Sequence, residues 1–113
     1  MEYLKEEKLS DIIHIDLDSV KGEKINEVWL ESFGGQIALA LERILAGASG
    51  ALQVTGAQRD VNSFLNTISA EADYLHKYYN LGLNNPNTWA SSGQLNNAIK
   101  QFETQTGIRW PLS

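Results

Sequence analysis

Apolar and polar residues alternate in two early stretches of the chain. Asp11–Leu17 reads D-I-I-H-I-D-L and Ile25–Ser32 reads I-N-E-V-W-L-E-S, with K-G-E-K between them. Period-two alternation is typical of strands with one buried face, and a two-residue turn that begins with Gly is typical of a type II′ hairpin. The pattern predicts an N-terminal β-hairpin with its turn centred on Gly22 and Glu23.

A helix is the alternative for the second stretch. Apolar residues also recur there at helical spacing, at Ile25, Trp29, Phe33, Ile37 and Leu41. Against the helix stand two adjacent glycines at 34 and 35, each of which costs about 1 kcal/mol relative to alanine in a helix interior. The hairpin is therefore the preferred interpretation, and an all-α bundle is the fold if it is wrong.

Three helices are predicted further along, near 36–46, 56–80 and 92–105, because apolar residues there recur at three- and four-residue intervals. Thr55 with Gln58, and Ser91 with Gln94, have the spacing of capping boxes that open the second and third helices. Glycines at 47, 82 and 107 are expected to end the three helices. The residues expected to face the core are Ile37, Leu41, Ile44, Leu45, Val61, Phe64, Leu65, Ile68, Ala72, Leu75, Tyr79, Leu95, Ala98, Ile99 and Phe102.

These elements predict a mostly α-helical α+β fold, with the hairpin packed on three helices. Leu52–Val54 is a candidate for a short third strand, and Trp110 and Leu112 are expected to dock a C-terminal tail on the core. With 113 residues, of which 42% are hydrophobic, the chain is long enough to bury one hydrophobic core without the help of disulfides or a bound metal. We expect one compact domain over residues 1–113.

Negative charge is concentrated at the N-terminus. Residues 1–31 hold nine acidic residues and four lysines, whereas residues 32–113 hold five acidic and five basic residues, so the net charge of −5 belongs to the first quarter. A pI near 4.9 argues against nucleic-acid binding, which needs clustered Lys and Arg. The absence of cysteine excludes disulfides and thiol catalysis, and no apolar run reaches the roughly 18–20 residues of a membrane span. We expect a soluble, cytoplasmic protein that binds no membrane.

The hairpin register places several acidic residues and one tryptophan on one face. Asp18 would lie opposite Glu27, with Asp16, Trp29 and Glu31 beside them. Like charges across a strand pair are destabilising, so their retention favours an acidic surface that binds a basic protein with Trp29 as its anchor. The alternative is a solvated outer face that serves only solubility.

A second candidate site combines asparagines with C-terminal aromatic residues. Asn85, Asn87 and Trp89 follow the long helix, and Arg109 and Trp110 end the chain. Neutral amides and stacking rings would suit a nucleotide- or sugar-like ligand. The plainer interpretation is that asparagines populate turns and helix ends.

Catalytic chemistry finds little support. His14-x-Asp16-x-Asp18 could present three metal-binding groups on a strand, but exposed strands often contain such patterns, and no metal or cofactor is predicted. Asp73 and His76 read as a pair on a helix surface. With no nucleophile–base pair, the sequence predicts a non-enzymatic interaction module, such as an inhibitor, an immunity-type factor or an accessory subunit, with self-assembly into a homo-oligomer left open.

Overall fold

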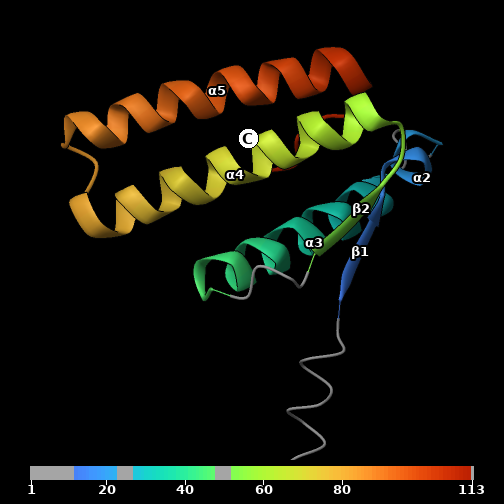
Figure 1. The fold of residues 1–113 in the computed structure, drawn as a ribbon, viewed down its shortest axis with the longest axis horizontal. Coiled ribbons are helices and arrows are strands. Elements are labelled where there is room, and N and C mark those ends of the chain that lie inside the picture. Colours follow the sequence, from blue (N-terminus) through green and yellow to red (C-terminus); the bar gives the residue numbers. More distant parts are fainter. Residues whose placement is uncertain (1–11, 23–26, 48–51, 113) are drawn as a thin grey trace, which may run out of the picture.

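The fold is a pair of long helices resting on a smaller layer of helix and parallel sheet (Figure 1). The computed structural model describes residues 12–22, 27–47 and 52–112, with the side chains of residues 21, 22 and 27–31 outside the description. In chain order the elements are β1 (Ile13–Asp16), α2 (Leu17–Gly22), α3 (Glu27–Leu45), β2 (Leu52–Thr55), α4 (Gln58–Leu81) and α5 (Pro86–Thr106). A mostly helical α+β fold, as the sequence predicts, is confirmed.

The predicted hairpin is wrong. β1 pairs in parallel with β2, in a register that runs from Ile13 opposite Leu52 to Asp16 opposite Thr55. Residues 27–32, expected as the second hairpin strand, instead begin α3. Parallel strands cannot be joined by a tight turn, and α2 with α3 forms the crossover that they need. The third strand predicted at Leu52–Val54 is confirmed as the partner of β1.

Asp16 is the reason that the chain turns into a helix after β1. Its Oδ1 accepts a hydrogen bond from the backbone N–H of Asp18 at 3.1 Å, and its Oδ2 accepts one from the Ser19 hydroxyl at 3.2 Å. These contacts are those of a helix N-cap, which satisfies an amide that the first turn would otherwise leave without a partner. The cap ends β1 one residue before the predicted strand ends and starts α2.

In α3 the helical spacing prevails despite its two glycines. A Cβ atom at Gly34 would lie 3.2 Å from the Cβ of Pro111, closer than most real Cβ contacts, whereas one at Gly35 would meet nothing within 4 Å. Gly34 therefore lets the C-terminal tail pass close to α3. A larger residue at this position would crowd Pro111, a tertiary constraint that helix propensity does not include.

Both predicted capping boxes are absent. Thr55 is the last residue of β2, and the N-cap of α4 is Ala57, which makes no side-chain cap hydrogen bond. α5 begins earlier than predicted, because Asn85 caps it through the N–H of Asn87 and Pro86 occupies its first turn. Ser91 lies inside this helix and is buried.

The helix ends after α4 and α5 agree with their glycines. Gly82 and Gly107 have φ of 82° and 74°, and their N–H groups donate to Tyr78 and Glu103. Gly47, after α3, also has a positive φ, of 89°. Such conformations favour glycine, so these three stop signals were correctly interpreted.

The core is centred on Phe64 of α4. Its ring centroid lies 6.3 Å from Phe33, 6.1 Å from Phe102 and 5.7 Å from Trp110. Trp110 is fully buried, so the predicted docking of the tail is confirmed for this residue, whereas Leu112 is exposed. Three residues predicted to face the core are also exposed, namely Leu45, Leu65 and Tyr79.

Candidate functional site

The residues predicted to form an acidic face do not share a strand ladder. Asp16 ends β1 and caps α2, and Asp18 is exposed in the first turn of α2. Glu27, Trp29 and Glu31 belong to the start of α3, and their side chains lie outside the description. The expected opposition of Asp18 and Glu27 across a hairpin is therefore wrong, because both residues belong to helices.

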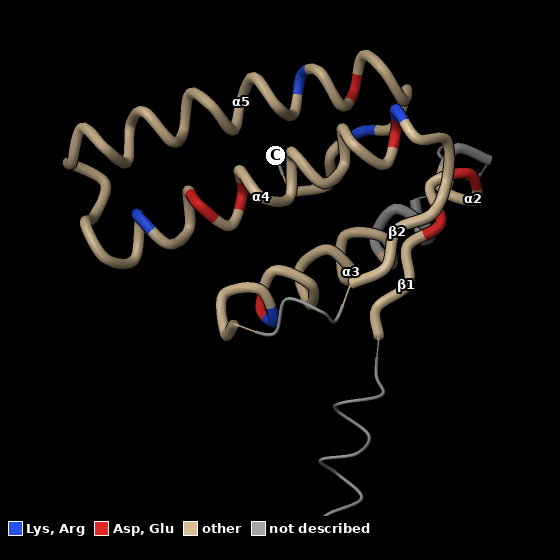
Figure 2. Tube along the Cα trace, viewed as in Figure 1, with Lys and Arg blue, Asp and Glu red and all other residues tan. Residues whose placement is uncertain are grey.

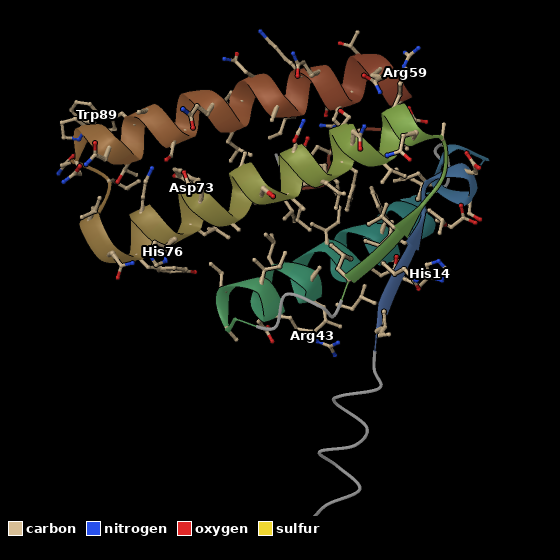
Figure 3. The ribbon with its side chains drawn as sticks, viewed as in Figure 1. His14, Arg43, Arg59, Asp73, His76 and Trp89 are labelled. Atoms are coloured by element: carbon tan, nitrogen blue, oxygen red, sulfur yellow. The ribbon has the colours of Figure 1, made fainter. Side chains whose placement is uncertain are left out.

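The structure also separates the predicted ligand-binding residues. Trp89 lies in the first turns of α5, at one end of the α4–α5 pair (Figure 3). Trp110 is fully buried against Phe102, with 5.3 Å between ring centroids. Thirteen residues separate Trp89 from Phe102 along the helix, which is about 20 Å at 1.5 Å per residue. Trp110 therefore cannot stack on a ligand held by Trp89, Asn85 and Asn87, and exposed Arg109 beside it belongs to the same distant end.

A different group of residues forms the most distinctive surface of the described chain. The end of the α4–α5 pair extends beyond α3 (Figure 1). Large apolar side chains are exposed there, with exposed fractions of 72% for Tyr79, 60% for Trp89 and 57% for Leu83. We call this surface the aromatic tip and define it by Tyr78, Tyr79, Leu81, Leu83 and Trp89.

Local hydrogen bonds order the loop of the aromatic tip. The Gly82 N–H donates to the Tyr78 carbonyl at 3.0 Å, which closes the end of α4. The indole N–H of Trp89 donates across the loop to the Leu83 carbonyl at 2.6 Å. Asn85 uses its side-chain oxygen to cap α5, so this asparagine is a structural residue of the turn. Trp89 is therefore held at the surface by its polar end while its ring stays exposed.

Tyrosines continue the surface along α4. The rings of Tyr74 and Tyr78 stack with centroids 6.3 Å apart, and those of Tyr78 and Tyr79 are 5.4 Å apart. The first pair follows from the i, i+4 spacing, which places both side chains on one side of a helix. A row of rings thus leads from the half-buried Tyr74 to the exposed Tyr79.

The aromatic tip is free of charge. Between Lys77 and Lys100 the sequence contains no Asp, Glu, Lys, Arg or His. Figure 2 shows the corresponding end of the α4–α5 pair without charged residues, whereas acidic residues appear at α2 on the far side of the molecule. Six asparagines accompany the rings in or beside this segment, at 80, 84, 85, 87, 96 and 97. The surface can bind through apolar area and neutral hydrogen bonds but not through ion pairs.

A polar contact joins the two helices just behind the aromatic tip. The hydroxyl of buried Ser91 donates to Oδ2 of Asp73 at 2.7 Å, and Lys77 Nζ lies 3.2 Å from the same oxygen. The hydrogen bond from Ser91, assisted by Lys77 and by the charge of His76, lowers the pKa of Asp73 below its ordinary value. Asp73 therefore stays ionised near neutral pH and fixes α5 against α4.

A second contact lies nearer the core. The hydroxyl of fully buried Thr67 is within hydrogen-bond distance of two carbonyls, that of Ser63 at 2.8 Å and that of Ala98 on α5 at 3.2 Å. Neither Thr67 nor Ser91 belongs to an apolar stripe, and sequence reasoning found neither contact. Together these two contacts hold α4 and α5 against each other behind the aromatic tip.

The two histidines of the described residues take part neither in a cluster of metal ligands nor in a contact with Ser91. Nε2 of His76 lies 3.2 Å from the amide nitrogen of Asn80, and Ser91 contacts Asp73 directly, so no serine–histidine pair exists there. His14 is exposed on β1, and no three His, Cys, Asp or Glu side chains in the described ranges gather as they would around a metal ion. No helix in these ranges is long and apolar enough to cross a membrane.

Two open grooves lie away from the aromatic tip. One, of about 600 Å³, has Arg59 and Lys100 among its lining residues. The other, of about 370 Å³, lies around Gly107 and Arg109. Arg59 marks the end of the α4–α5 pair opposite Trp89 in Figure 3, so neither groove extends the aromatic tip. Two exposed cations in an open groove do not by themselves define an anion site.

One buried acid is explained by the fold. Glu71 on α4 is 7% exposed, and its Oε1 accepts the indole N–H of Trp110 at 2.9 Å. Burial raises the pKa of Glu71 above its ordinary value, while the hydrogen bond from Trp110 acts in the opposite direction. Perturbed acids often mark active sites, but this carboxyl holds the tail in place and faces no groove named above.

Comparison with known proteins identifies no relative. No protein-family model, no curated protein and no solved structure matches this chain significantly. The function of the chain is therefore inferred from its surface.

Proposed function

We propose that this chain is a non-enzymatic protein-interaction module that contacts its partner through the aromatic tip. The exposure of Tyr79, Trp89 and Leu83 at one end of a supported helix pair is the observation that carries the proposal. Exposing large apolar rings to water is unfavourable, so a group of them at one end of the fold is a candidate for burial by a partner. Tyrosine and tryptophan are also the side chains that most often anchor protein interfaces.

The expectation of a basic partner has less support than the aromatic tip. Its acidic hairpin face is not formed, and Asp16 already serves as the cap of α2. What remains is the excess of acidic residues in positions 1–31. A basic protein at that end would be a separate contact, whose strength would fall steeply with salt.

The small-ligand alternative is also weakened. Of its five residues, Trp110 is in the core, Arg109 lies near it, and Asn85 is engaged in capping. Trp89 and Asn87 are left as contacts for a ligand, which is little surface compared with the 70–90% burial typical of bound small molecules. A protein surface can cover the whole aromatic tip, so a protein-interaction module is the better proposal.

Site-specific photo-cross-linking tests the proposal. The cross-linker p-benzoylphenylalanine is introduced in place of Tyr79 and, as a matched control, in place of Leu65, which is 41% exposed on the same helix. In an extract of the cells that make the protein, we expect a saturable protein adduct from position 79 only. The adduct should be competed by unmodified protein and lost when Trp89→Ser is added. Equal adducts at both positions, or none at position 79, would contradict the proposal.

A further inference from the structure

We propose that the occupant of the aromatic tip is a second copy of this chain, joined tip to tip across a two-fold axis. This inference rests on the proposed function and names its partner. It follows from the distribution of charge and of hydrogen-bonding groups over the described residues.

A two-fold contact places one surface patch against the same patch of the other copy. A patch that carries charge of one sign therefore meets its own sign, which is unfavourable unless both signs are arranged symmetrically. The aromatic tip avoids this conflict because residues 78–99 hold no charged side chain. Tyrosine hydroxyls and asparagine amides both donate and accept hydrogen bonds, so they can pair with their own kind. The aromatic tip therefore holds no charge that would oppose contact with a second copy.

The position of the charge favours the same orientation. The net charge is −5, and the excess of acidic residues lies in positions 1–31. Asp16 and Asp18 lie at the β1–α2 end, opposite the aromatic tip along the longest axis (Figures 1 and 2). Two copies of a protein with net charge −5 repel one another, and contact through the end that lacks charged residues keeps Asp16 and Asp18 of the two copies far apart. Contact through the sheet or α2 would bring them together.

The aromatic tip is also prepared for association before a partner arrives. The bond from Trp89 Nε1 to the Leu83 carbonyl fixes the loop, and the Ser91–Asp73 bond fixes the helices behind it. Ordering flexible groups at an interface is a cost of binding, and a surface that is already ordered avoids much of it. A neutral, ordered and apolar patch therefore fits a homodimer contact.

Sedimentation equilibrium of the full chain over a range of concentrations tests the dimer. We expect a reversible monomer–dimer equilibrium, weakened about tenfold or more by Tyr79→Ser or Trp89→Ser, as for hot-spot residues. Leu65→Ser is the matched control, since Leu65 is exposed on α4 away from the aromatic tip, and it should leave the equilibrium unchanged. Circular dichroism and the Tm of each variant establish that it is folded. A monomer at every concentration, or equal weakening by the control, overturns the inference.

The orientation is tested with introduced cysteines, because the chain has none of its own. Asn84→Cys places a thiol in the loop of the aromatic tip, and Thr55→Cys places one at the end of β2 beside α2. A short bismaleimide should link two copies through position 84 and not through position 55. Linking through position 55 alone would show a dimer formed at the sheet end and would overturn the tip-to-tip arrangement.

The two proposals fail in different ways. A photo-adduct from position 79 with a different protein, together with a monomeric chain, would retain the interaction function and overturn the second-copy inference. The loss of any saturable adduct from position 79, including the homodimer, would overturn both.

Discussion

Trp110 and Glu71 lie thirty-nine positions apart in the sequence and meet inside the core, where the indole N–H donates to the carboxyl Oε1 over 2.9 Å. The backbone N–H of Trp110 also donates to Glu103 on α5 at 2.8 Å. The tail is thus joined to both long helices by the carboxyl groups of Glu71 and Glu103. This arrangement places a buried carboxyl at the centre of the fold and makes stability depend on its protonation.

Glu71→Gln should change how stability depends on pH. Burial raises the pKa of Glu71, so the folded protein holds this proton more tightly than the unfolded chain does. The contribution is therefore fully present below the ordinary pKa of glutamate and is lost as pH rises through the raised value. Glutamine keeps an acceptor for the indole without the charge, so the variant should gain stability relative to wild type as pH rises from about 4 to about 8. Urea unfolding at several pH values checks this, with Glu42→Gln as the exposed control. Parallel curves for wild type and Glu71→Gln would contradict it.

Two tryptophans allow a matched comparison of buried and exposed indole hydrogen bonds. Trp110→Phe leaves the buried Glu71 without its indole donor, and we expect a loss of about 1–3 kcal/mol in unfolding free energy. Trp89→Phe also removes an indole hydrogen bond, but at a site 60% exposed to water, and should cost no more than about 0.5 kcal/mol. Denaturant unfolding of both variants tests the difference, and equal losses would show that burial does not control the strength of these contacts.

The two glycines of α3 form a second matched pair. Gly35→Ala adds a methyl group in open space inside a helix and should stabilise the protein by about 0.5–1 kcal/mol. Gly34→Ala brings the same gain in helix propensity but places its Cβ 3.2 Å from Pro111, so the tail must shift. We expect Gly34→Ala to be less stable than Gly35→Ala, with the difference reduced when Pro111→Gly, which removes the Cβ of residue 111, is added to both variants. Equal stability of the two single variants would show that the tail yields without cost.

These relationships explain which parts of the fold could be predicted from the sequence. The long apolar periodicity of α4, the glycine that ends α5 and the docking of Trp110 are local signals that tertiary packing supports. The predicted hairpin is wrong because the segment around Trp29 fits both the two-residue period of a strand and the helical period. The close approach of Pro111 to Gly34, which explains a glycine inside this helix, is not visible in the sequence. The sequence does contain a signal for the helix cap, because Asp16 stands directly before an apolar residue. The alternation of apolar and polar residues around Asp16, however, is typical of a strand.

The candidate site was harder to predict for a geometric reason. Periodicity puts Tyr79 on the same stripe as Phe64 and Ile68, and such a stripe is normally buried. α4 is longer than the layer beneath it, however, and α3 ends before α4 does (Figure 1). Only the spatial arrangement shows that the side chain of Tyr79 is left exposed. The uncharged interval between Lys77 and Lys100 was the signal in the sequence that could have indicated this surface.

Asp16 should prove to be a structural residue. Asp16→Ala removes both contacts to the first turn of α2 and should cost about 0.5–2 kcal/mol, as for other N-cap losses. Asp16→Asn removes the charge but keeps an oxygen that can accept the Asp18 N–H, so it should retain most of the stability. Thermal unfolding of both variants separates capping from charge. A loss of equal size in Asp16→Asn would show that the negative charge itself is needed there.

Salt provides the sharpest distinction between the two kinds of contact that this chain offers. Dimerisation through the aromatic tip forms no ion pair, and screening reduces the repulsion between two copies of net charge −5. The dissociation constant of the dimer should therefore stay constant or fall when NaCl is raised from about 50 to about 500 mM, a range over which the Debye length shortens severalfold. A contact between the acidic N-terminal quarter and basic residues of another copy would respond in the opposite direction. Sedimentation equilibrium at several salt concentrations measures this, and a steep rise in the dissociation constant would assign the contact to the charged end instead.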